Sequence, residues 1–348
     1  MHRRLPVTAF AVLAAAAVAV AAGAAFAATA AKNGTVKQVA IATPAKPSDY
    51  GWNQQGYNAA KAAAASASAK FVAQTNIGYD KTESVLRQLA QGGADFIVAH
   101  ASGYDTIASR IATQYKVPIM TYDIPTQLTK NYVSNITTSS QQGSYLAGIL
   151  AARTTKTSHV AVVISASDTN WYKMSGGFVA GVKKVNKKIK ISFVTISSAG
   201  YDDSAGGKRV VTQVIATGAD VIFGMGDNAS FGYLQGIETA NAGHKVWFIG
   251  DIGNMGPIDK KHVLLSSVLW SFTRAFKQAI SDINAGSYGT HGYNLTLANG
   301  GISLLKTRLI PANVWAQIQS AKAGVMNGTI KVPLTTKAGQ VKALIKQK

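Results

Sequence analysis

GGADFIVAH, at residues 92–100, recurs as TGADVIFGM at residues 217–225. In each copy a glycine ends a helix-like segment, and an aspartate opens a continuous apolar run. Apolar runs without polar alternation are typical of strands that are buried on both faces of a parallel sheet. The repeat therefore predicts the same helix–strand unit once in each half of the chain.

Further apolar runs surround the two copies, and helix-like segments such as YDTIASRIATQY and GKRVVTQVIATG separate them. Alternation of strands and helices predicts an α/β fold with parallel sheets. With four strands in each half, we expect two doubly wound α/β domains that enclose a ligand cleft beyond the carboxyl ends of their strands. The expected strands lie at 37–43, 70–75, 95–100 and 118–123, and at 159–165, 190–196, 220–226 and 245–251.

The N-terminal segment has the pattern of an export signal. Arg3 and Arg4 precede an alanine-rich apolar run, and AFA at 25–27 and ATA at 28–30 fit an A-x-A cleavage site. We expect residues 1–27 to be a cleaved signal peptide, with an uncleaved membrane anchor as the alternative because the run is long enough to span a bilayer. The sequence contains no cysteine, so we expect neither disulfides nor a lipid-attachment cysteine.

The charge of the chain is strongly basic. It has 35 lysines and arginines against 15 aspartates and glutamates, a formal net charge of +20. These basic residues are dispersed, and the densest run, KKVNKKIK at 183–190, lies at an expected helix end, where cations suit the helix dipole. We interpret the charge as a source of solubility and of attraction to anionic envelope surfaces, and we expect no nucleic-acid partner.

Polar and aromatic residues follow the expected strands, at the positions where a cleft between two such domains would lie. In the first half they occur in PAKPSDYGWNQ, directly after the third strand, and at the end of the fourth strand. In the second half they occur in ASDTNWYK, SSAGYDDSAGGK and GDNAS, and at the end of KVWFIGD. The candidate ligand-binding residues are Asp49, Trp52, Asn53, His100, Asp123, Trp171, Tyr172, Tyr201, Lys208, Asp227 and Asp251.

Several longer segments resemble the basic membrane protein family of ABC-importer substrate-binding proteins. The resemblance rests on NYVSNITTSSQQGSYLAGILAARTTKT (131–157), SGGFVAGVKKVN (175–186) and IPANVWAQIQSAKAGVMNGTIKVP (310–333), together with GADVIFGMG and KVWFIGD, in that family's order. It implies the type I periplasmic binding protein fold, a small-molecule ligand in the interdomain cleft, and a permease with its ATPase as partner. Several members bind purine nucleosides, so the resemblance implies such a ligand here.

The resemblance also implies roles for single residues. The family's first loop usually holds an aspartate followed by a phenylalanine and an asparagine, which match Asp49, Trp52 and Asn53. The family phenylalanine stacks on the purine, so Trp52 would take its place; the alternative is a tryptophan packed on the first helix. Tyr201 matches a second aromatic residue from the opposite domain, and Lys208 matches a basic residue in the same loop, with a solvated lysine as the alternative.

In the family, carboxylates that end cleft-facing strands accept hydrogen bonds from ribose hydroxyls. Asp123, Asp227 and Asp251 match those positions. An ionised carboxylate suits a diol because it is an acceptor with several lone pairs. A helix cap or a turn is the alternative role for each aspartate. The family's lipid-attachment cysteine is missing, and GDNAS replaces a turn that is often glycine-rich, so the ligand's identity stays open.

We expect a first lobe at 31–133 that regains 271–290, and a second lobe at 134–270 with 291–348. Three crossings between the lobes would form the hinge of an exported monomer that meets the membrane only through its permease. A sugar-binding protein of the same fold is the alternative function.

A nucleoside-processing enzyme is the alternative of a different class, but the chain shows no HExxH, no G-x-S-x-G and no spacing typical of a metal site. We therefore expect no catalysis, no cofactor and no metal. A repressor of the same architecture would need an N-terminal helix-turn-helix, where this chain has the signal pattern.

Overall fold

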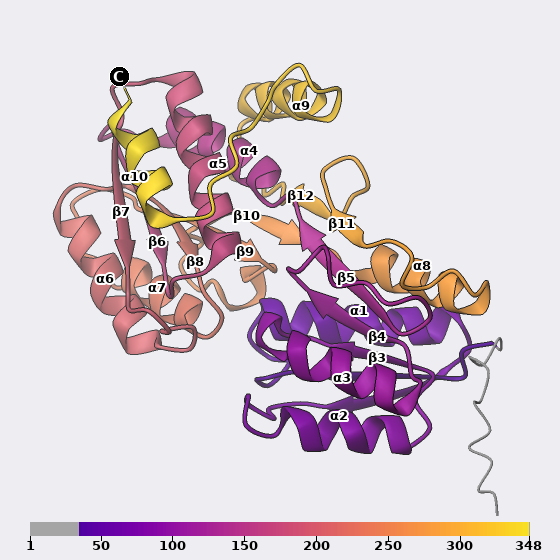
Figure 1. Ribbon diagram of the computed structural model, residues 1–348. Coiled ribbons are helices and arrows are strands. Elements are labelled where there is room, and N and C mark those ends of the chain that lie inside the picture. Colours follow the sequence, from indigo (N-terminus) through magenta and orange to yellow (C-terminus); the bar gives the residue numbers. More distant parts are fainter. Residues whose placement is uncertain (1–34, 348) are drawn as a thin grey trace, which may run out of the picture. The chain divides into compact units, whose positions relative to one another are not determined.

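The computed structural model of the protein describes residues 35–347 (Figure 1), so the predicted signal peptide at 1–27 lies outside the described residues. Within 35–347, no helix is long and apolar enough to cross a bilayer. The described residues belong to one compact unit that contains two six-stranded sheets. All eight strands predicted from the sequence are present.

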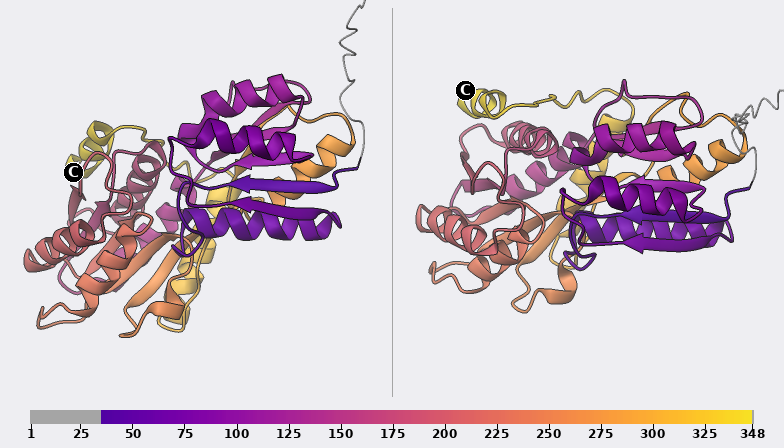
Figure 2. Two further views of the ribbon diagram at one scale, coloured as in Figure 1. Left: turned by 90° about the horizontal axis from the view of Figure 1, so that it is seen from below. Right: turned by 60° about the horizontal axis from the view of Figure 1, so that its bottom comes forward.

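The first sheet has the strand order β11-β5-β4-β3-β1-β2, and all its strands pair in parallel. Helices α2 and α3 pack on one face, and α1 and α8 share a hydrophobic cluster on the other (Figure 2). We refer to this sheet with its four helices as the first lobe. Its elements are β1 (Gln38–Ala42), α1 (Trp52–Ser66), β2 (Lys70–Gln74), α2 (Thr82–Gln91), β3 (Phe96–Ala99), the 3₁₀ turn η1 (Ser102–Tyr104), α3 (Asp105–Tyr115), β4 (Ile119–Tyr122), β5 (Val133–Thr138), α8 (Thr273–Asn284) and β11 (Tyr293–Leu295).

The second sheet repeats this order as β12-β10-β9-β8-β6-β7. Helices α4 and α5 cover one face, and α6 and α7 cover the other. The second lobe comprises α4 (Gln141–Thr154), β6 (His159–Ile164), α5 (Thr169–Val185), β7 (Lys190–Thr195), α6 (Ser204–Ala216), β8 (Val221–Met225), α7 (Ala229–Glu238), β9 (Trp247–Ile252), the 3₁₀ turn η2 (Gly256–Ile258), β10 (Leu264–Trp270), β12 (Ile302–Leu304), α9 (Ala312–Met326) and α10 (Ala338–Lys346). The two sheets differ at their last strand, because β12 is antiparallel to β10 whereas β11 is parallel to β5.

The two copies of the repeated motif occupy equivalent positions, before β3 and before β8. Gly93 and Gly218 both have positive φ, 84° and 98°, a conformation that glycine adopts without strain. The carboxylate of Asp95 accepts hydrogen bonds from the amides of Lys37 and Gln38, both at 2.9 Å. Asp220 likewise accepts from Lys156 and Thr157, at 2.6 and 3.0 Å. Each aspartate therefore ties the start of its strand to the segment that leads into the neighbouring strand, β1 or β6.

Strand membership places the lobe boundaries later than the sequence predicted. Strand β5 (Val133–Thr138) pairs with β4, so the first sheet continues past the expected boundary at 133. Strand β11 (Tyr293–Leu295) pairs with β5, so the returning segment continues past 290. The chain passes between the sheets three times: after β5, after β10 and after β11. A strand belongs to the sheet whose neighbouring strand it hydrogen-bonds to. That pairing is a tertiary contact, and the local sequence around 133 and 290 does not reveal it.

Candidate functional site

A cavity of about 690 Å³ lies at the carboxyl ends of the strands, with walls from both lobes. Its volume falls within the range of small-molecule sites. The lining residues are Pro44, Ala45, Trp52, Asn53, Gly78, Tyr79, Ala101, Ser102, Gly103, Asp168, Asn170, Trp171, Ala199, Gly200, Tyr201, Asp202, Asp203, Asp227, Ile252 and Trp270.

Trp52 is the first residue of α1 and is fixed on one side by the imidazole of His100. The two rings stack with centroids 4.3 Å apart and planes 16° from parallel. The indole Nε1–H donates to the His100 carbonyl at 2.9 Å. Since Trp52 is half-buried and lines the cavity, its indole also presents surface to a ligand. The same side chain therefore packs on His100 and lines the cavity, and its stacking on a purine stays a prediction.

His100 supports Trp52 from beneath and does not line the cavity. It is fully buried, with Nδ1 2.6 Å from the Tyr122 hydroxyl and Nε2 2.9 Å from the Trp52 carbonyl. Burial lowers the pKa of His100 to about 3, so the ring is neutral near pH 7. A Cβ on Gly56 of α1 would lie 2.1 Å from Nε2, so glycine is required for this approach. His100 positions the tryptophan and has no free polar atom for a ligand.

The second lobe contributes an aromatic pair, Trp171 and Tyr201, with ring centroids 5.1 Å apart. The Trp171 indole N–H donates to Asp251 Oδ2 at 3.1 Å, and the other Asp251 oxygen accepts from the Gly226 amide at 3.4 Å. Asp251 is 5% exposed, and burial raises its pKa to about 8. The structure therefore places Asp251 behind Trp171, where it orients the indole, and not on the cavity wall.

Four carboxylates line the cavity, and three of them already accept hydrogen bonds from other residues of the protein. Asp168 caps α5, accepting from the amides of Asn170 and Trp171 at 2.8 and 3.1 Å. Asp203 caps α6. Asp202 accepts from the Asn228 side chain at 2.8 Å.

Asp227 is the fourth, and no side chain or amide of residues 35–347 donates a hydrogen bond to its carboxylate. Burial, together with the carboxylates of Asp49, Asp202, Asp251 and Asp168, raises its pKa well above the usual range. Asp227 is therefore the wall carboxylate that is available to a ligand.

Asp123 directly follows β4, beside the cavity, and links the two lobes. Its φ of 63° lies in the left-handed region, and its carboxylate accepts from Ser102 Oγ at 2.6 Å. The Asn170 side chain of α5 donates to both Asp123 oxygens at 3.1 Å. Asp123 is therefore already paired across the lobes and does not line the cavity.

Other predicted site residues lie outside the wall as well. Asp49 is 2% exposed and accepts from the amides of Gly51, Asn53 and Gln54, so it fixes the start of α1. Lys208 lies on α6 and Tyr172 on α5, and neither lines the cavity. Asn53 lines the cavity, but its side chain already donates a hydrogen bond to Asp49 and accepts one from the Ala45 amide.

Sequence reasoning did not single out Tyr79, Asp168, Asn170 or Trp270, all of which line the cavity. Asp168 and Asn170 stand in ASDTNWYK, the same segment that contains Trp171, so their place after β6 was the signal for them. Tyr79 lies in the loop after β2, and the segments that resemble the family do not include this loop. Trp270 ends β10, a strand that the sequence did not predict.

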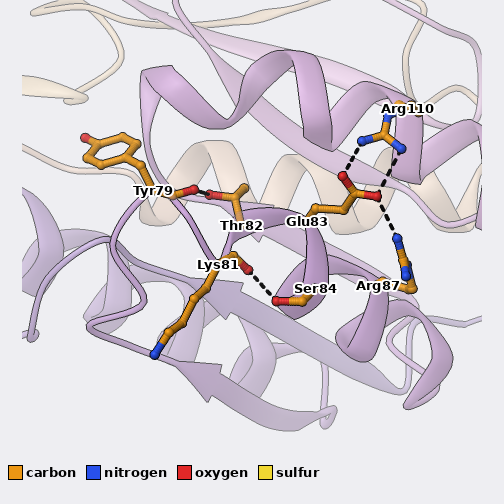
Figure 3. A network of polar contacts seen from close by, with 7 residues as sticks. All are labelled: Tyr79, Lys81, Thr82, Glu83, Ser84, Arg87 and Arg110. Carbon is orange, nitrogen blue, oxygen red and sulfur yellow. Dashed lines mark hydrogen bonds and ion pairs between the residues drawn. The ribbon is translucent and has the colours of Figure 1, made fainter.

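The loop that carries Tyr79 is anchored to the helices behind it (Figure 3). The Tyr79 carbonyl accepts from Thr82 Oγ1 at 2.6 Å, and Glu83 bridges Arg87 and Arg110, each pair approaching to 2.6 Å. Exposed ion pairs contribute little stability, but the bridge joins α2 to α3 at the base of this loop. The Tyr79 ring is 56% exposed and meets Tyr104 edge to face.

Residues 35–347 contain no group of three or more histidine, cysteine, aspartate or glutamate side chains that would hold a metal ion. The cavity offers aromatic faces and carboxylates instead. Flat ring systems and hydrogen-bond donors are the ligand features that such walls recognise.

The chain is similar to known proteins in sequence and in structure. The chain is 30% identical over 205 residues to a CD4+ T-cell-stimulating antigen of Listeria monocytogenes serovar 1/2a, covering 55% of this chain and 57% of that protein. It is 25% identical over 214 residues to the ABC transporter nucleoside-binding protein BmpA of Lactococcus lactis subsp. cremoris, covering 58% of this chain and 60% of that protein. These matches thus span less than two thirds of either relative's length.

A solute-binding protein of an ABC transporter system from Aeropyrum pernix K1 superposes with a TM-score of 0.75 at 20% identity, covering 89% of this chain and 96% of that one. This likeness shows the type I periplasmic binding protein fold that the sequence predicted. The family model described as ABC transporter substrate-binding protein, PnrA-like, matches residues 36–336. The chain therefore belongs to the Bmp family of PnrA-like ABC transporter substrate-binding proteins.

Proposed function

We propose that the chain is the extracytoplasmic ligand-binding component of an ABC importer and that its cavity takes a purine nucleoside. The observation that carries the proposal is the placement of Trp52. Its indole is stacked on His100 and also lines a cavity whose wall in the other lobe bears Trp171 and Tyr201. A flat base would stack on these rings, at about 1–3 kcal/mol for each base–aromatic contact.

The ribose would be recognised by the polar part of the wall. No group of residues 35–347 donates a hydrogen bond to the Asp227 carboxylate. A ribose diol offers two hydroxyl donors. Asp227 is half-buried, so a ligand that donates to its carboxylate is favoured over an analogue that lacks the donor. In this arrangement Asp227 receives the sugar, whereas Asp123 and Asp251 act through Asn170 and Trp171.

Transport by such a protein needs binding, closure of the lobes, docking on the permease and release, with no chemistry on the ligand. Closure has a physical basis in contacts that already join the lobes. The Asn170 amide reaches Asp123, and the rings of Tyr50 and Phe231 meet edge to face at 6.3 Å. The three passages of the chain between the sheets, after β5, β10 and β11, would absorb the backbone change of a hinge.

Isothermal titration of the described chain with adenosine, guanosine and inosine, their 2′,3′-dideoxy forms, the free bases and ribose tests the proposal. We expect ribonucleosides to bind at least about tenfold more tightly than the dideoxy forms or the bases, because only they satisfy Asp227 and the rings together. Tight binding of ribose alone would make the protein a sugar receptor. Absence of binding by every nucleoside would refute the assignment.

A further inference from the structure

The cavity has the opposite charge to the protein that surrounds it. The chain carries a formal net charge of +20, yet four of its 15 acidic residues line the cavity. Among residues 35–347, no lysine or arginine lines it. Behind the wall lie three more carboxylates, those of Asp49, Asp123 and Asp251. One ammonium group also lies there, that of Lys173, which donates to Asn170 Oδ1 at 3.0 Å.

The positive ends of helices offset only part of this charge. Helices α1, α5 and α6 begin at a lining residue or directly after one, and α7 begins two residues after the lining residue Asp227. Each helix start is equivalent to about half a positive charge, so the four together offset about two of the seven carboxylates. Burial raises the pKa of Asp251 to about 8, which removes about one more negative charge near pH 7. The cavity remains negative after both corrections.

The aromatic walls favour a cation for an independent reason. Five aromatic residues line the cavity: Trp52, Trp171, Tyr201, Trp270 and Tyr79. The faces of such rings are negative, and they attract a cation most strongly when water is excluded. Tryptophan gives the strongest attraction, and three of the five tryptophans in the chain line this one cavity.

We infer that the cavity selects a purine nucleoside whose base carries a positive charge, such as an N-methylated base that cannot lose it at neutral pH. The inference rests on the proposed function, because it assigns a charge to the ligand of the same site. A cationic ring gains from the aromatic faces and from the carboxylates together. The same wall disfavours a phosphorylated nucleotide, since no lysine or arginine within 35–347 lines the cavity and four carboxylates do.

Two isomers test the charge without changing the size of the ligand. 1-Methyladenosine is cationic at neutral pH, and N6-methyladenosine is its uncharged isomer. We expect calorimetric titration at pH 7 to show that 1-methyladenosine binds about tenfold or more tightly than N6-methyladenosine. The preference should weaken as salt is added, because screening reduces the field of the carboxylates at the cavity mouth. Adenosine 5′-monophosphate should bind more weakly than either isomer.

The Asp227→Asn variant tests whether the carboxylates of the cavity wall cause the preference for 1-methyladenosine. The variant should reduce the advantage of 1-methyladenosine severalfold while changing N6-methyladenosine less. Glu238→Gln, at the other end of α7, is the matched control for a one-charge change and should leave both affinities unaltered. Equal or tighter binding of N6-methyladenosine by the wild-type protein would overturn the inference while leaving the proposed function intact. Failure of every nucleoside, charged or not, would instead overturn the proposed function.

Discussion

Asp251 shows how a buried carboxyl group can serve a binding site without touching the ligand. Its oxygens are held by the Trp171 indole and the Gly226 amide, and it is 5% exposed. The sequence correctly placed Asp251 at the end of a cleft-facing strand. It could not show that Trp171 would lie in front of it, because the direction of that indole depends on how α5 packs beside β9.

The raised pKa of Asp251 predicts a pH-dependent stability. The folded protein holds this proton up to about pH 8, whereas the unfolded chain releases it at the usual carboxyl value of about 3.9. The folded state thus binds more protons between these values, and stability is lost as the pH rises through this window. We expect the free energy of unfolding of the wild type to fall relative to Asp251→Asn, by up to about 1.4 kcal/mol per pH unit.

Urea unfolding of both proteins at pH 5, 6, 7 and 8 measures this difference. Asparagine cannot ionise, so any constant offset between the two proteins, such as a weaker contact with Gly226, does not change with pH. Parallel curves for the two proteins would show that the Asp251 carboxyl group titrates normally.

The contact between α4 and α5 depends on glycines that let the two backbones meet. A Cβ on Gly181 would lie 2.1 Å from the Tyr145 carbonyl oxygen, and one on Gly148 would lie 2.1 Å from that of Phe178. The segment SGGFVAGVKKVN contributed to the family resemblance, and its glycines now have a packing reason. The two helices cover one face of the second sheet, so this contact sets how closely they lie beside each other there.

Gly181→Ala should therefore destabilise the protein, although alanine is the better helix former. Overpacking a close contact costs about 1–3 kcal/mol or more. In an open helix position the same change stabilises by up to about 1 kcal/mol. Gly339→Ala in α10, where a Cβ meets nothing within 4 Å, is the matched control. Thermal and urea unfolding of both variants should give opposite signs, and stabilisation by Gly181→Ala would contradict the packing.

The strands that the sequence did not predict have a shared physical cause. β5 and β10 contain polar residues within their buried runs, so they lack the continuous apolar pattern of the other strands. These side chains are satisfied by backbone carbonyls: Ser134 donates to His291, Ser266 to Leu305 and Ser267 to Gly253. The acceptors lie 14 to 157 residues away in the chain, which a local pattern does not report. β11 and β12 are only three residues long.

Taken across both lobes, the sequence predicted the repeat, the sheets and the loops that meet at the cavity. It placed Trp52, Asn53, Trp171, Tyr201 and Asp227 among the ligand-binding candidates, and all five line one cavity. It did not predict which carboxylates the protein would use for itself, because capping and cross-lobe pairing are decided by tertiary contacts. Nor did the net charge of +20 indicate that the cavity would be acidic.

The central claim is that the cavity binds a flat ligand against Trp52, and the affinity of Trp52 variants for a nucleoside tests it most directly. The series is wild type, Trp52→Phe, Trp52→Ala and the control Trp315→Ala; Trp315 lies on α9, does not line the cavity and contacts Lys306. Calorimetry should show a loss of about tenfold to a hundredfold for Trp52→Ala, because a stacking contact is worth about 1–3 kcal/mol. Trp52→Phe keeps an aromatic face and should bind more tightly than Trp52→Ala, and Trp315→Ala should match the wild type. Unchanged affinity in a folded Trp52→Ala protein would contradict the claim and leave Trp52 with a packing role alone.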